Sequence, residues 1–317
     1  MELLFLCIGL VLLILGGEFA LRGALGLARN LGVSPAIIGL TVLGFGTSAP
    51  ELVVTVRAAL TGSVDIAVGN AVGSNIANTF LILGIGALIC PLVCDPKAVY
   101  RDTGFMVAAS VLLCVLGYFG VIERWEGVAM VMALFIFICW SYFHDIRTHD
   151  AAADLHTDMA DEKQDSPTKP LSIAIHLFAG ICGLVYGASL LVDSAVTLAE
   201  AAGVPQSIIG LTLVAFGTSL PELGATAIAA WRRHTDVAVA NVVGSNIFNI
   251  LGVLGVGAIF HPLEIAPEIS GIDQWIVLAS AIILVPILIT GWRINRMEGV
   301  VLLLLYIGYI SSVIMRV

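Results

Sequence analysis

Charge is scarce in this sequence. Lysine, arginine, aspartate and glutamate make up 12% of the 317 residues, about half the share in a soluble domain, whereas 59% are hydrophobic. The mean hydropathy is +1.04. The N-terminus, MELLFLCIGLVLLILGGEFA, also lacks the basic start and small-residue cleavage site of a removable signal peptide. The composition excludes an ordinary soluble domain, and we expect the first hydrophobic stretch to be retained as a membrane span.

The sequence also lacks the patterns of common metal and catalytic sites. Its six cysteines are scattered through apolar segments without metal-ligand spacing, which is typical of small packing residues. No HExxH motif occurs, and the six histidines are not paired with a membrane-embedded serine or carboxylate. We expect no enzyme activity, no cofactor, no nucleic-acid partner and no obligate protein partner.

Long hydrophobic stretches, in contrast, fill most of the chain. Ten of them have about 18 to 25 residues, enough for a helix to cross a hydrocarbon core of about 30 Å. The pattern predicts an all-α polytopic membrane protein with ten transmembrane helices in a lipid bilayer. The predicted spans lie near residues 3–24, 36–60, 66–90, 102–121, 125–143, 171–192, 207–231, 237–260, 272–291 and 297–315.

Basic residues between the predicted spans indicate the orientation of the chain. Of the 14 lysines and arginines, all but Arg57, Arg124 and Arg316 lie on one side, in the connections after the odd-numbered spans. Because the basic side of a membrane protein faces the cytoplasm, we expect the central loop inside the cell and both termini outside. The expected location is the cell inner membrane.

The chain contains two copies of one pattern, 171 residues apart. GLTVLGFGTSAPEL at 39–52 matches GLTLVAFGTSLPEL at 210–223, and VGNAVGSNIANTFLILGIGA at 68–87 matches VANVVGSNIFNILGVLGVGA at 239–258. Because each copy belongs to a half with five spans, the second copy enters the membrane from the opposite face. We expect two inverted-topology five-helix repeats, residues 1–143 and 171–317.

An acidic linker, residues 144–170, joins the two halves on the expected cytoplasmic side. It contains three histidines among its acids, but no metal-ligand spacing recurs there. Its composition therefore favours a solvated tether over a regulatory metal site.

A carboxylate occupies the same position in each copy of the motif. Glu51 and Glu222 lie near the middle of the second and seventh predicted spans, where a lone charge costs at least about 2.5 kcal/mol. The alternative is a pair of protonated carboxyls that only bond neighbouring helices, but helix packing gives no reason to place one twice at the same motif. The pair predicts a cation site.

Further oxygen ligands are expected beside these glutamates. Pro50 and Pro221 lack an amide hydrogen, so the carbonyls four residues earlier lose their helical partners and both spans should break there. Broken backbone at this depth is tolerated where it lines a cavity or is buried in protein. The candidate ligands next to the breaks are the hydroxyls of Thr47, Ser48, Thr218 and Ser219.

The third and eighth predicted spans carry a second polar set, which repeats at the same offset. In each span a serine and an asparagine one helical turn later share a face, which favours a lined site over interhelical hydrogen bonds. The asparagine directly after each serine points about 100 degrees away and is a weaker candidate. Gly73 and Gly244 are expected to allow close approach to the broken spans. The set is Asn70, Ser74, Asn75 and Asn78 with Asn241, Ser245, Asn246 and Asn249.

These side chains suit a hard divalent cation. Calcium prefers six or more oxygen ligands, and two carboxylates neutralise its charge. No cysteine or histidine joins the set, which argues against zinc, copper or iron. Sodium can compete for the same oxygens, and an empty site with two unpaired negative charges is too costly to move through an apolar gate. The pattern favours exchange of Ca²⁺ for Na⁺, with both ions as substrates.

The doubled motif, GTSAPE with GNAVGSN and GTSLPE with ANVVGSN, resembles the alpha repeats of the sodium/calcium exchanger branch of the cation/calcium antiporter superfamily. The resemblance implies ten helices and electrogenic, sodium-driven calcium transport. Asn249 is an aspartate in some relatives, including potassium-dependent exchangers, so a potassium-independent exchanger is expected. The ligands that the resemblance implies are Thr47, Ser48, Glu51, Ser74, Asn78, Thr218, Ser219, Glu222, Ser245 and Asn249.

Three other functions stay open from the sequence. A proton-coupled calcium exchanger would use the same carboxylates, but its relatives carry a Glu-His pair in this motif and neither copy here has one. A passive channel is less compatible with inverted halves that carry matched carboxylates. An intramembrane enzyme would need catalytic groups that the sequence lacks.

Overall fold

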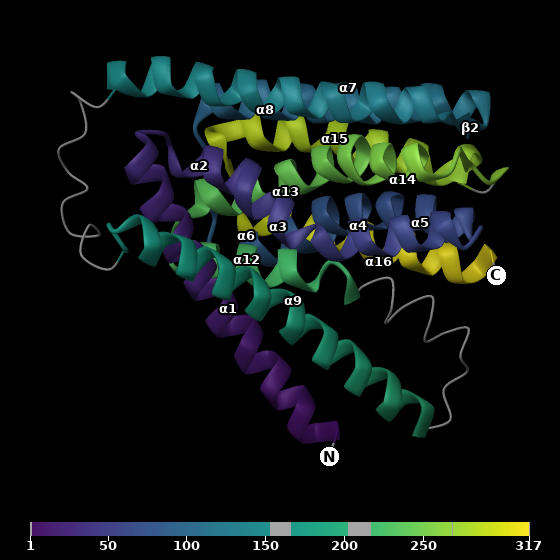
Figure 1. Cartoon of the computed structure of the whole chain (residues 1–317), viewed down its shortest axis with the longest axis horizontal. Helices are drawn as coiled ribbons and strands as arrows, with labels where there is room; N and C mark the ends of the chain where they lie inside the picture. Colours follow the sequence, from purple (N-terminus) through teal and green to yellow (C-terminus); the bar gives the residue numbers. More distant parts are fainter. Residues whose placement is uncertain (1, 153–165, 202–216, 268, 317) are drawn as a thin grey trace.

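The computed structural model describes residues 2–152, 166–201, 217–267 and 269–316. Its helices run mostly side by side along the long dimension of the molecule (Figure 1). Within the described residues, eight helices are long and apolar enough to cross a membrane, and two more meet at a bend of 43° to form a ninth span. The long uninterrupted helices are α1 (Glu2–Leu31), α7 (Pro96–Phe119), α8 (Arg124–Ala152), α9 (Pro170–Ala201), α15 (Gln274–Ile289) and α16 (Arg296–Arg316).

The other spans are assembled from shorter helices, several of them separated by π-helical turns. The second span consists of α2 (Pro35–Ile38), η1 (Gly39–Leu43), α3 (Gly44–Thr47) and α4 (Ala49–Leu60). The third contains α5 (Val64–Ile76), η2 (Ala77–Ile82) and α6 (Leu83–Ile89). The eighth contains α13 (Thr235–Phe248), η6 (Asn249–Leu254) and α14 (Gly255–Phe260). The short helix α12 (Leu220–Trp231) stands before it, and α15 is flanked by η7 (Ile269–Asp273) and η8 (Thr290–Trp292).

The predicted class, an all-α polytopic membrane protein, is confirmed. Nine of the ten predicted spans coincide with described spans, although three helices continue well past their predicted ends: α1 to Leu31, α8 to Ala152 in the predicted linker, and α9 to Ala201. The seventh predicted span, 207–231, is described from residue 217 onward and includes α12, whereas 207–216 lies outside the described residues. The number of ten spans and their inverted arrangement stay predictions.

Four two-residue strands join the connections between spans. The strand β1 (Leu92–Val93) pairs antiparallel with β4 (Arg293–Ile294), so the connections after the third and ninth spans meet. In the same way, β2 (Val121–Ile122) pairs with β3 (Leu263–Glu264), which joins the connections after the fourth and eighth spans. Each pair therefore contains one strand from each predicted half.

Side chains link further connections at the β1–β4 end. The Thr235 hydroxyl lies 2.9 Å from the Val93 carbonyl oxygen and 3.2 Å from its amide nitrogen, so the connection after the seventh span joins this group. The Asp145 carboxylate accepts bonds from the Ser34 amide at 2.7 Å and the Ser34 hydroxyl at 2.9 Å. This bond holds the connection after the first span against the end of the fifth.

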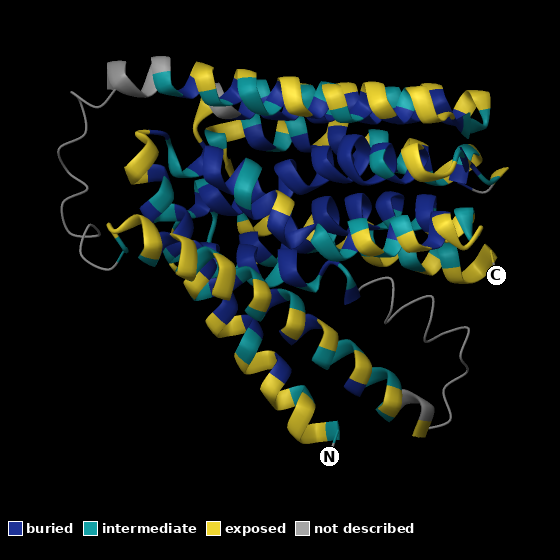
Figure 2. Cartoon of the chain, in the orientation of Figure 1, coloured by how far each residue is buried: buried dark blue, intermediate teal, exposed yellow. Residues whose placement is uncertain are grey.

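Burial decreases from the centre of the bundle outward (Figure 2). Among the eight described spans other than the bent second one, the eighth is the most enclosed, with 89% of its apolar segment buried, and the third follows with 72%. For α16 the figure is only 11%. The eighth and third spans are the ones that carry the repeated serine and asparagine set, so these polar groups lie in the middle of the protein.

The helices α1 and α9 form an outer pair that leaves the main bundle at an angle (Figure 1). Glycines allow their backbones to approach closely. An added Cβ on Gly16 would lie 2.6 Å from the Leu184 amide nitrogen, and one on Gly180 would overlap the backbone of Ala20. Small residues at helix contacts are the usual means of tight packing in a bilayer.

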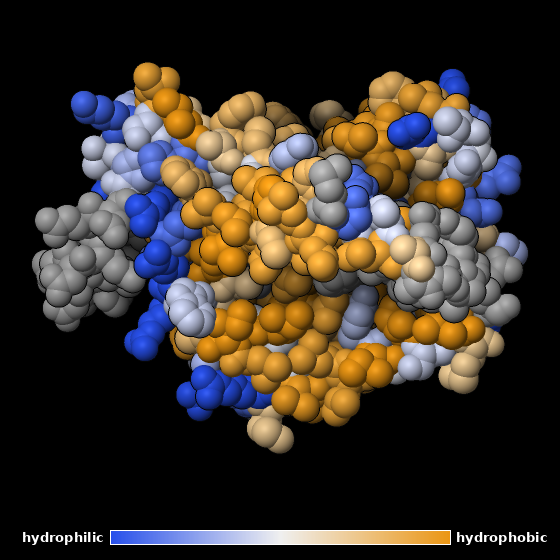
Figure 3. All heavy atoms as spheres, turned by 90° about the horizontal axis from the view of Figure 1, so that it is seen from below, coloured by the Kyte–Doolittle hydropathy of each residue, from blue (hydrophilic) through white to orange (hydrophobic). Residues whose placement is uncertain are grey.

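The outer surface is that of a membrane protein. Seen from the α1–α9 side, a broad hydrophobic zone covers the middle of the molecule, and hydrophilic atoms gather toward its ends (Figure 3). Large apolar side chains on outward faces, such as Leu3, Trp125, Phe178 and Met315, are 70% to 80% exposed. Lipid tails would cover such side chains at no cost.

Candidate ion-binding site

Both motif copies interrupt their helix at the serine that precedes the proline. Ser48 separates α3 from α4 with φ −83° and ψ 8°, and Ser219 precedes α12 with φ −87° and ψ 4°. The predicted break is therefore present in the first copy. In the second copy α12 also begins directly after the serine, although residues 210–216 of the motif lie outside the described part of the chain. Each break places the following glutamate in the first turn of a new helix.

The two glutamates are fully buried and are bonded crosswise. Ser48, from the first half of the chain, donates its hydroxyl to Glu222 Oε1 at 2.8 Å. Ser219, from the second half, donates to Glu51 Oε1 at 3.4 Å. Both glutamates and both serines are 0% exposed. Residues far apart in the sequence are thus brought to one place between α4 and α12.

The serines of the third and eighth spans join this cluster in different ways. Ser74 donates to Glu51 Oε1 at 3.4 Å. Ser245, its counterpart, lies 3.5 Å from Thr47 Oγ1 and bonds the Gly44 carbonyl at 3.4 Å. The two copies of the site are therefore similar in composition but not identical in geometry.

Asn78 and Asn249 lie one turn after these serines, where the helix changes from α to π. Asn78 is the second residue of η2, and Asn249 is the first residue of η6. Single π-helical turns occur often at functional sites because they re-aim side chains. We find no sequence signal that predicts these π turns. Both amides are fully buried, and neither forms a hydrogen bond to another described residue.

Of the ten predicted ligands, eight form a short contact with another ligand or with Asn70. Besides the glutamates and serines, Thr47 contacts Ser245, and Thr218 donates to Asn70 Oδ1 at 3.4 Å. Asn78 and Asn249 are buried on the same two spans but have no such contact. The structure therefore supports a common location, whereas ion binding by each side chain stays a prediction.

Three of the four remaining asparagines in the repeated polar set donate to threonines. Asn246 donates to Thr79 Oγ1 at 2.9 Å, away from the glutamates, as the helical wheel predicts for this position. Asn70 and Asn241 donate to Thr55 and Thr226, two threonines that the sequence analysis overlooked. Those threonines stand at equivalent positions in the two copies, 171 residues apart, and that match is the signal that points to them.

Close helix approach is seen at one of the two predicted glycines. An added Cβ on Gly244 would overlap the Leu40 carbonyl oxygen, so α13 can pack against η1 only because this residue is glycine. At Gly73, an added Cβ would meet no described atom within 4 Å. Its expected neighbour, Leu211, lies outside the described residues.

The unpartnered atoms at the site match the needs of a hard cation. Four buried side-chain oxygens have no hydrogen-bond partner among the described residues: Oε2 of Glu51 and Glu222, and Oδ1 of Asn78 and Asn249. Buried polar atoms are normally satisfied, and buried carboxylates need a compensating charge. Calcium and sodium favour such oxygen ligands. Within the described part of the chain, no group of three or more histidine, cysteine, aspartate or glutamate side chains is placed to hold a metal.

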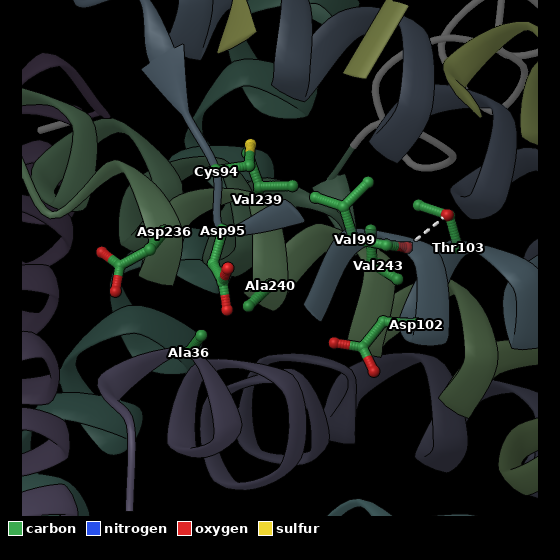
Figure 4. A pocket seen from close by; sticks show the side chains of 10 residues that line it. All are labelled: Ala36, Cys94, Asp95, Val99, Asp102, Thr103, Asp236, Val239, Ala240 and Val243. Carbon is green, nitrogen blue, oxygen red and sulfur yellow. Dashed lines mark hydrogen bonds between the residues drawn. The ribbon is translucent and has the colours of Figure 1, made fainter. Parts of the chain in front are cut away.

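A separate small pocket lies near the β1–β4 connections and contains none of the predicted ligands (Figure 4). Cys94, Asp95 and Asp236 all line this pocket, but in Figure 4 the Asp236 carboxylate and the Cys94 sulfur point away from the Asp95 carboxylate. Burial, with these two negative neighbours, raises the pKa of the Cys94 thiol to about 12. Asp102, on the same pocket, is paired with Arg101 at 2.6 Å.

Comparison with known proteins identifies the class of protein that this fold and site represent. The family model of the sodium/calcium exchanger protein matches residues 1–143 and 172–315. The chain therefore belongs to the sodium/calcium exchanger family, as its doubled motif predicts. This membership also confirms that it is a transporter and not an enzyme, with ions as substrates and no cofactor.

Similar proteins cover nearly the whole chain. CaxA of Alkalimonas amylolytica is 38% identical, with 96% of both chains aligned. The sodium/calcium exchanger MaX1 of Methanosarcina acetivorans is 32% identical over 97% of both chains. Among solved structures, the sodium-calcium exchanger NCX_Mj, soaked with zero Na⁺ and Ca²⁺, has a TM-score of 0.84 at 30% identity over 98% of both chains.

Proposed function

We propose that this chain exchanges Ca²⁺ for Na⁺ across the cell inner membrane by alternating access, electrogenically and without K⁺. The observation that carries the proposal is the crosswise pair of buried glutamates. Each uses one carboxylate oxygen to accept a serine hydroxyl from the opposite half of the chain, and its other oxygen has no hydrogen-bond partner among the described residues. Two such carboxylates match the charge of one calcium ion.

The proposed ligands are the ten residues that the motif supplies. Glu51 and Glu222 would bind Ca²⁺ directly, with the hydroxyls beside the helix breaks and the amide oxygens of Asn78 and Asn249 completing the oxygen shell. Na⁺ would use the same carboxylates and the flanking hydroxyls. Because nine of these ten residues are buried and Thr218 is half-buried, ions must shed most of their water on entry, and the protein oxygens must replace it.

Coupling follows from the cost of buried charge. With no cation bound, the site would hold carboxylates without compensation, and such a charge is expensive to carry past apolar side chains. Reorientation is therefore restricted to the loaded site, which makes the movement of one ion depend on the return of the other. An exchange of more than two Na⁺ for each Ca²⁺ moves net charge.

We also propose that residues 1–143 and 171–317 are inverted repeats and that the linker lies in the cytoplasm. The strand pairs support this arrangement because each joins the two halves. The contacts at the β1–β4 end link the connections that carry most of the basic residues, which favours a cytoplasmic location for that end. Helical spans of this kind belong to the inner membrane, since outer-membrane proteins are closed β-barrels.

The decisive experiment is sodium-gradient-driven uptake of calcium-45 into proteoliposomes. Glu51→Gln and Glu222→Gln are each expected to reduce uptake to background while the protein stays folded, because the amide keeps the shape and loses the charge. Glu264→Gln is a matched control, since Glu264 is an exposed carboxylate on β3. Full activity of either site variant would overturn the proposal.

The same vesicles separate sodium coupling from proton coupling. With equal pH on both sides, an outward Na⁺ gradient should drive uptake, whereas a pH gradient without Na⁺ should not. Removal of K⁺ from both sides should leave the rate unchanged. Because the exchange moves net charge, an imposed membrane potential should change the rate, and a rate independent of potential would contradict the electrogenic part of the proposal.

A further inference from the structure

Two asparagines at equivalent positions form different bonds in the two halves of the site. Asn70 on α5 and Asn241 on α13 are 171 residues apart in the repeat. Each donates its amide to a threonine on the neighbouring helix of its own half, Thr55 or Thr226, and both distances are 3.1 Å. This shared bond is the part of the arrangement that the two halves have in common.

Among the described residues, Asn70 forms additional bonds to the ion site and Asn241 does not. The Asn70 Nδ2 atom also donates to the backbone carbonyl of Glu51 at 3.1 Å, and Asn70 Oδ1 accepts the Thr218 hydroxyl at 3.4 Å. Asn70 therefore holds the main chain at one glutamate and the threonine at the helix break of the opposite half. Asn241 Oδ1, in contrast, is buried and has no partner among the described residues.

Thr47, the threonine at the other break, contacts a serine of the opposing helix and not the asparagine. Thr47, the counterpart of Thr218, lies 3.5 Å from Ser245 Oγ and donates to its own helix at the Leu43 carbonyl, 3.0 Å away. Ser245 comes four residues after Asn241, which is one turn of an α-helix. Thr218 therefore contacts the asparagine position of the helix it faces, whereas Thr47 contacts the serine position, one turn further along the equivalent helix.

We propose that Asn70 and Asn241 are positioning residues that act in turn during transport. Asn70 holds the site in the state described here, and Asn241 takes over in the oppositely facing state. The inference rests on the proposed function, because inverted repeats reach the opposite state by exchanging their arrangements. In that state Thr47 moves one turn to Asn241, and Thr218 moves from Asn70 to Ser74.

Such an exchange keeps the number of bonds balanced. In either state one asparagine holds a threonine while the other has an unpartnered oxygen. The two states therefore differ little in hydrogen bonding, which is what a transporter needs in order to populate both. A one-turn shift of one element past another is also a known way for packed helices to switch between two discrete positions.

The test compares Asn70→Ala with Asn241→Ala in two vesicle preparations. Everted vesicles present the cytoplasmic face to added Ca²⁺, and right-side-out vesicles present the outer face. Each variant should raise the half-saturating Ca²⁺ concentration about fivefold to tenfold more at one face than at the other, as expected from the loss of one or two hydrogen bonds that form in only one state. The affected face should be opposite for the two variants.

Thr55→Val and Thr226→Val provide the matched control, because they remove only the bond that both halves share. These two variants should lower thermal stability equally and shift half-saturation equally at the two faces.

If an alanine variant does not fold, the serine variant at the same position replaces it, and the same difference in half-saturating Ca²⁺ concentration between the two faces is expected. Shifts at the same face for both asparagine variants, or equal shifts at both faces, would overturn the inference while the proposed exchange stands. A wild-type chain that takes up no calcium would overturn both.

Discussion

The Ser48 hydroxyl donates to Glu222 Oε1 at 2.8 Å, although the two residues belong to different halves of the chain. The equivalent bond, from Ser219 to Glu51 Oε1, is longer at 3.4 Å. Each carboxylate is therefore oriented by the helix break of the opposite copy and not by its own. A movement of one half relative to the other must change both bonds, which links the geometry of the ion site to the arrangement of the two halves.

Ser48→Ala should weaken calcium binding more than Ser219→Ala does. A hydrogen bond to a charged group contributes about 1.5–3 kcal/mol, and a bond at 3.4 Å is weaker than one at 2.8 Å. We expect the half-saturating Ca²⁺ concentration of Ser48→Ala to rise at least about tenfold, since a factor of ten corresponds to about 1.4 kcal/mol. Calcium titration of the purified protein by calorimetry measures this directly. A larger effect of Ser219→Ala would contradict the geometry.

Gly244→Ala should disturb the packing of α13 against η1. The added methyl would overlap the Leu40 carbonyl oxygen, which cannot move without shifting the backbone beside the site. Overpacking of this kind costs about 1–3 kcal/mol. Thermal unfolding in detergent should show a lowered midpoint together with reduced transport. Gly308→Ala is the control, since its added Cβ meets no described atom within 4 Å; equal stability of the two variants would count against the close contact.

The ion pair between Glu18 and Arg232 should contribute modestly to stability. Arg232, at the end of α12, contacts the Glu18 carboxylate of α1 through two nitrogens at 2.7 and 2.8 Å, and Arg22 bonds the same carboxylate at 2.7 Å. Because the Arg232 side chain is 49% exposed, its contribution is limited to about 1 kcal/mol. A double-mutant cycle of Glu18→Gln and Arg232→Gln measures it. Strictly additive losses of stability would show that the pair contributes nothing.

The Cys94 thiol should resist maleimide at pH 8. The thiolate is the reactive form, and a pKa of about 12 leaves almost none of it at that pH. Because the pKa is raised, the thiolate fraction and the reaction rate should still rise about tenfold per pH unit above pH 8 and level off only near pH 12. The measurement uses a variant in which the other five cysteines are alanine, with the same protein unfolded in detergent as the positive control. Rapid labelling of the native protein at pH 8 would show that the thiol is neither buried nor close to Asp95 and Asp236.

The interruption of the second span was predicted from Pro50, which has no amide hydrogen and so removes a helical bond, and the structure bends there by 43°. Proline alone does not decide such a break, since Pro286 lies inside the continuous helix α15. Ser74 does lie 3.4 Å from Glu51 Oε1, on the face that it shares with the asparagine one turn later, and its role in ion binding stays a prediction. The equivalence of Ser74 and Ser245, in contrast, did not extend to their bonds. Identical residues in two repeats can occupy different positions when the repeats adopt different arrangements.

Two features were not predictable from local patterns. The π-helical turns at Asn78 and Asn249 depend on how the third and eighth spans pack against their neighbours, and no residue type enforces such a turn. Likewise, the roles of Asn70 and Thr55 depend on contacts between helices. The sequence shows that Thr55 and Thr226 occupy equivalent positions in the two copies. It does not show that each of them accepts a hydrogen bond from an asparagine.

The sequence by itself determined that this protein lies in a membrane, that its halves are copies and that two carboxylates stand at matched positions. Hydrophobic length, residue identity and the geometry of proline are properties of the chain alone. Only the tertiary structure decided which serine bonds which glutamate. It also decided that Thr218 contacts an asparagine of the opposing helix, whereas Thr47 contacts the serine one turn later. Those relationships depend on how two halves that are distant in sequence are packed, and the same residues permit more than one such packing.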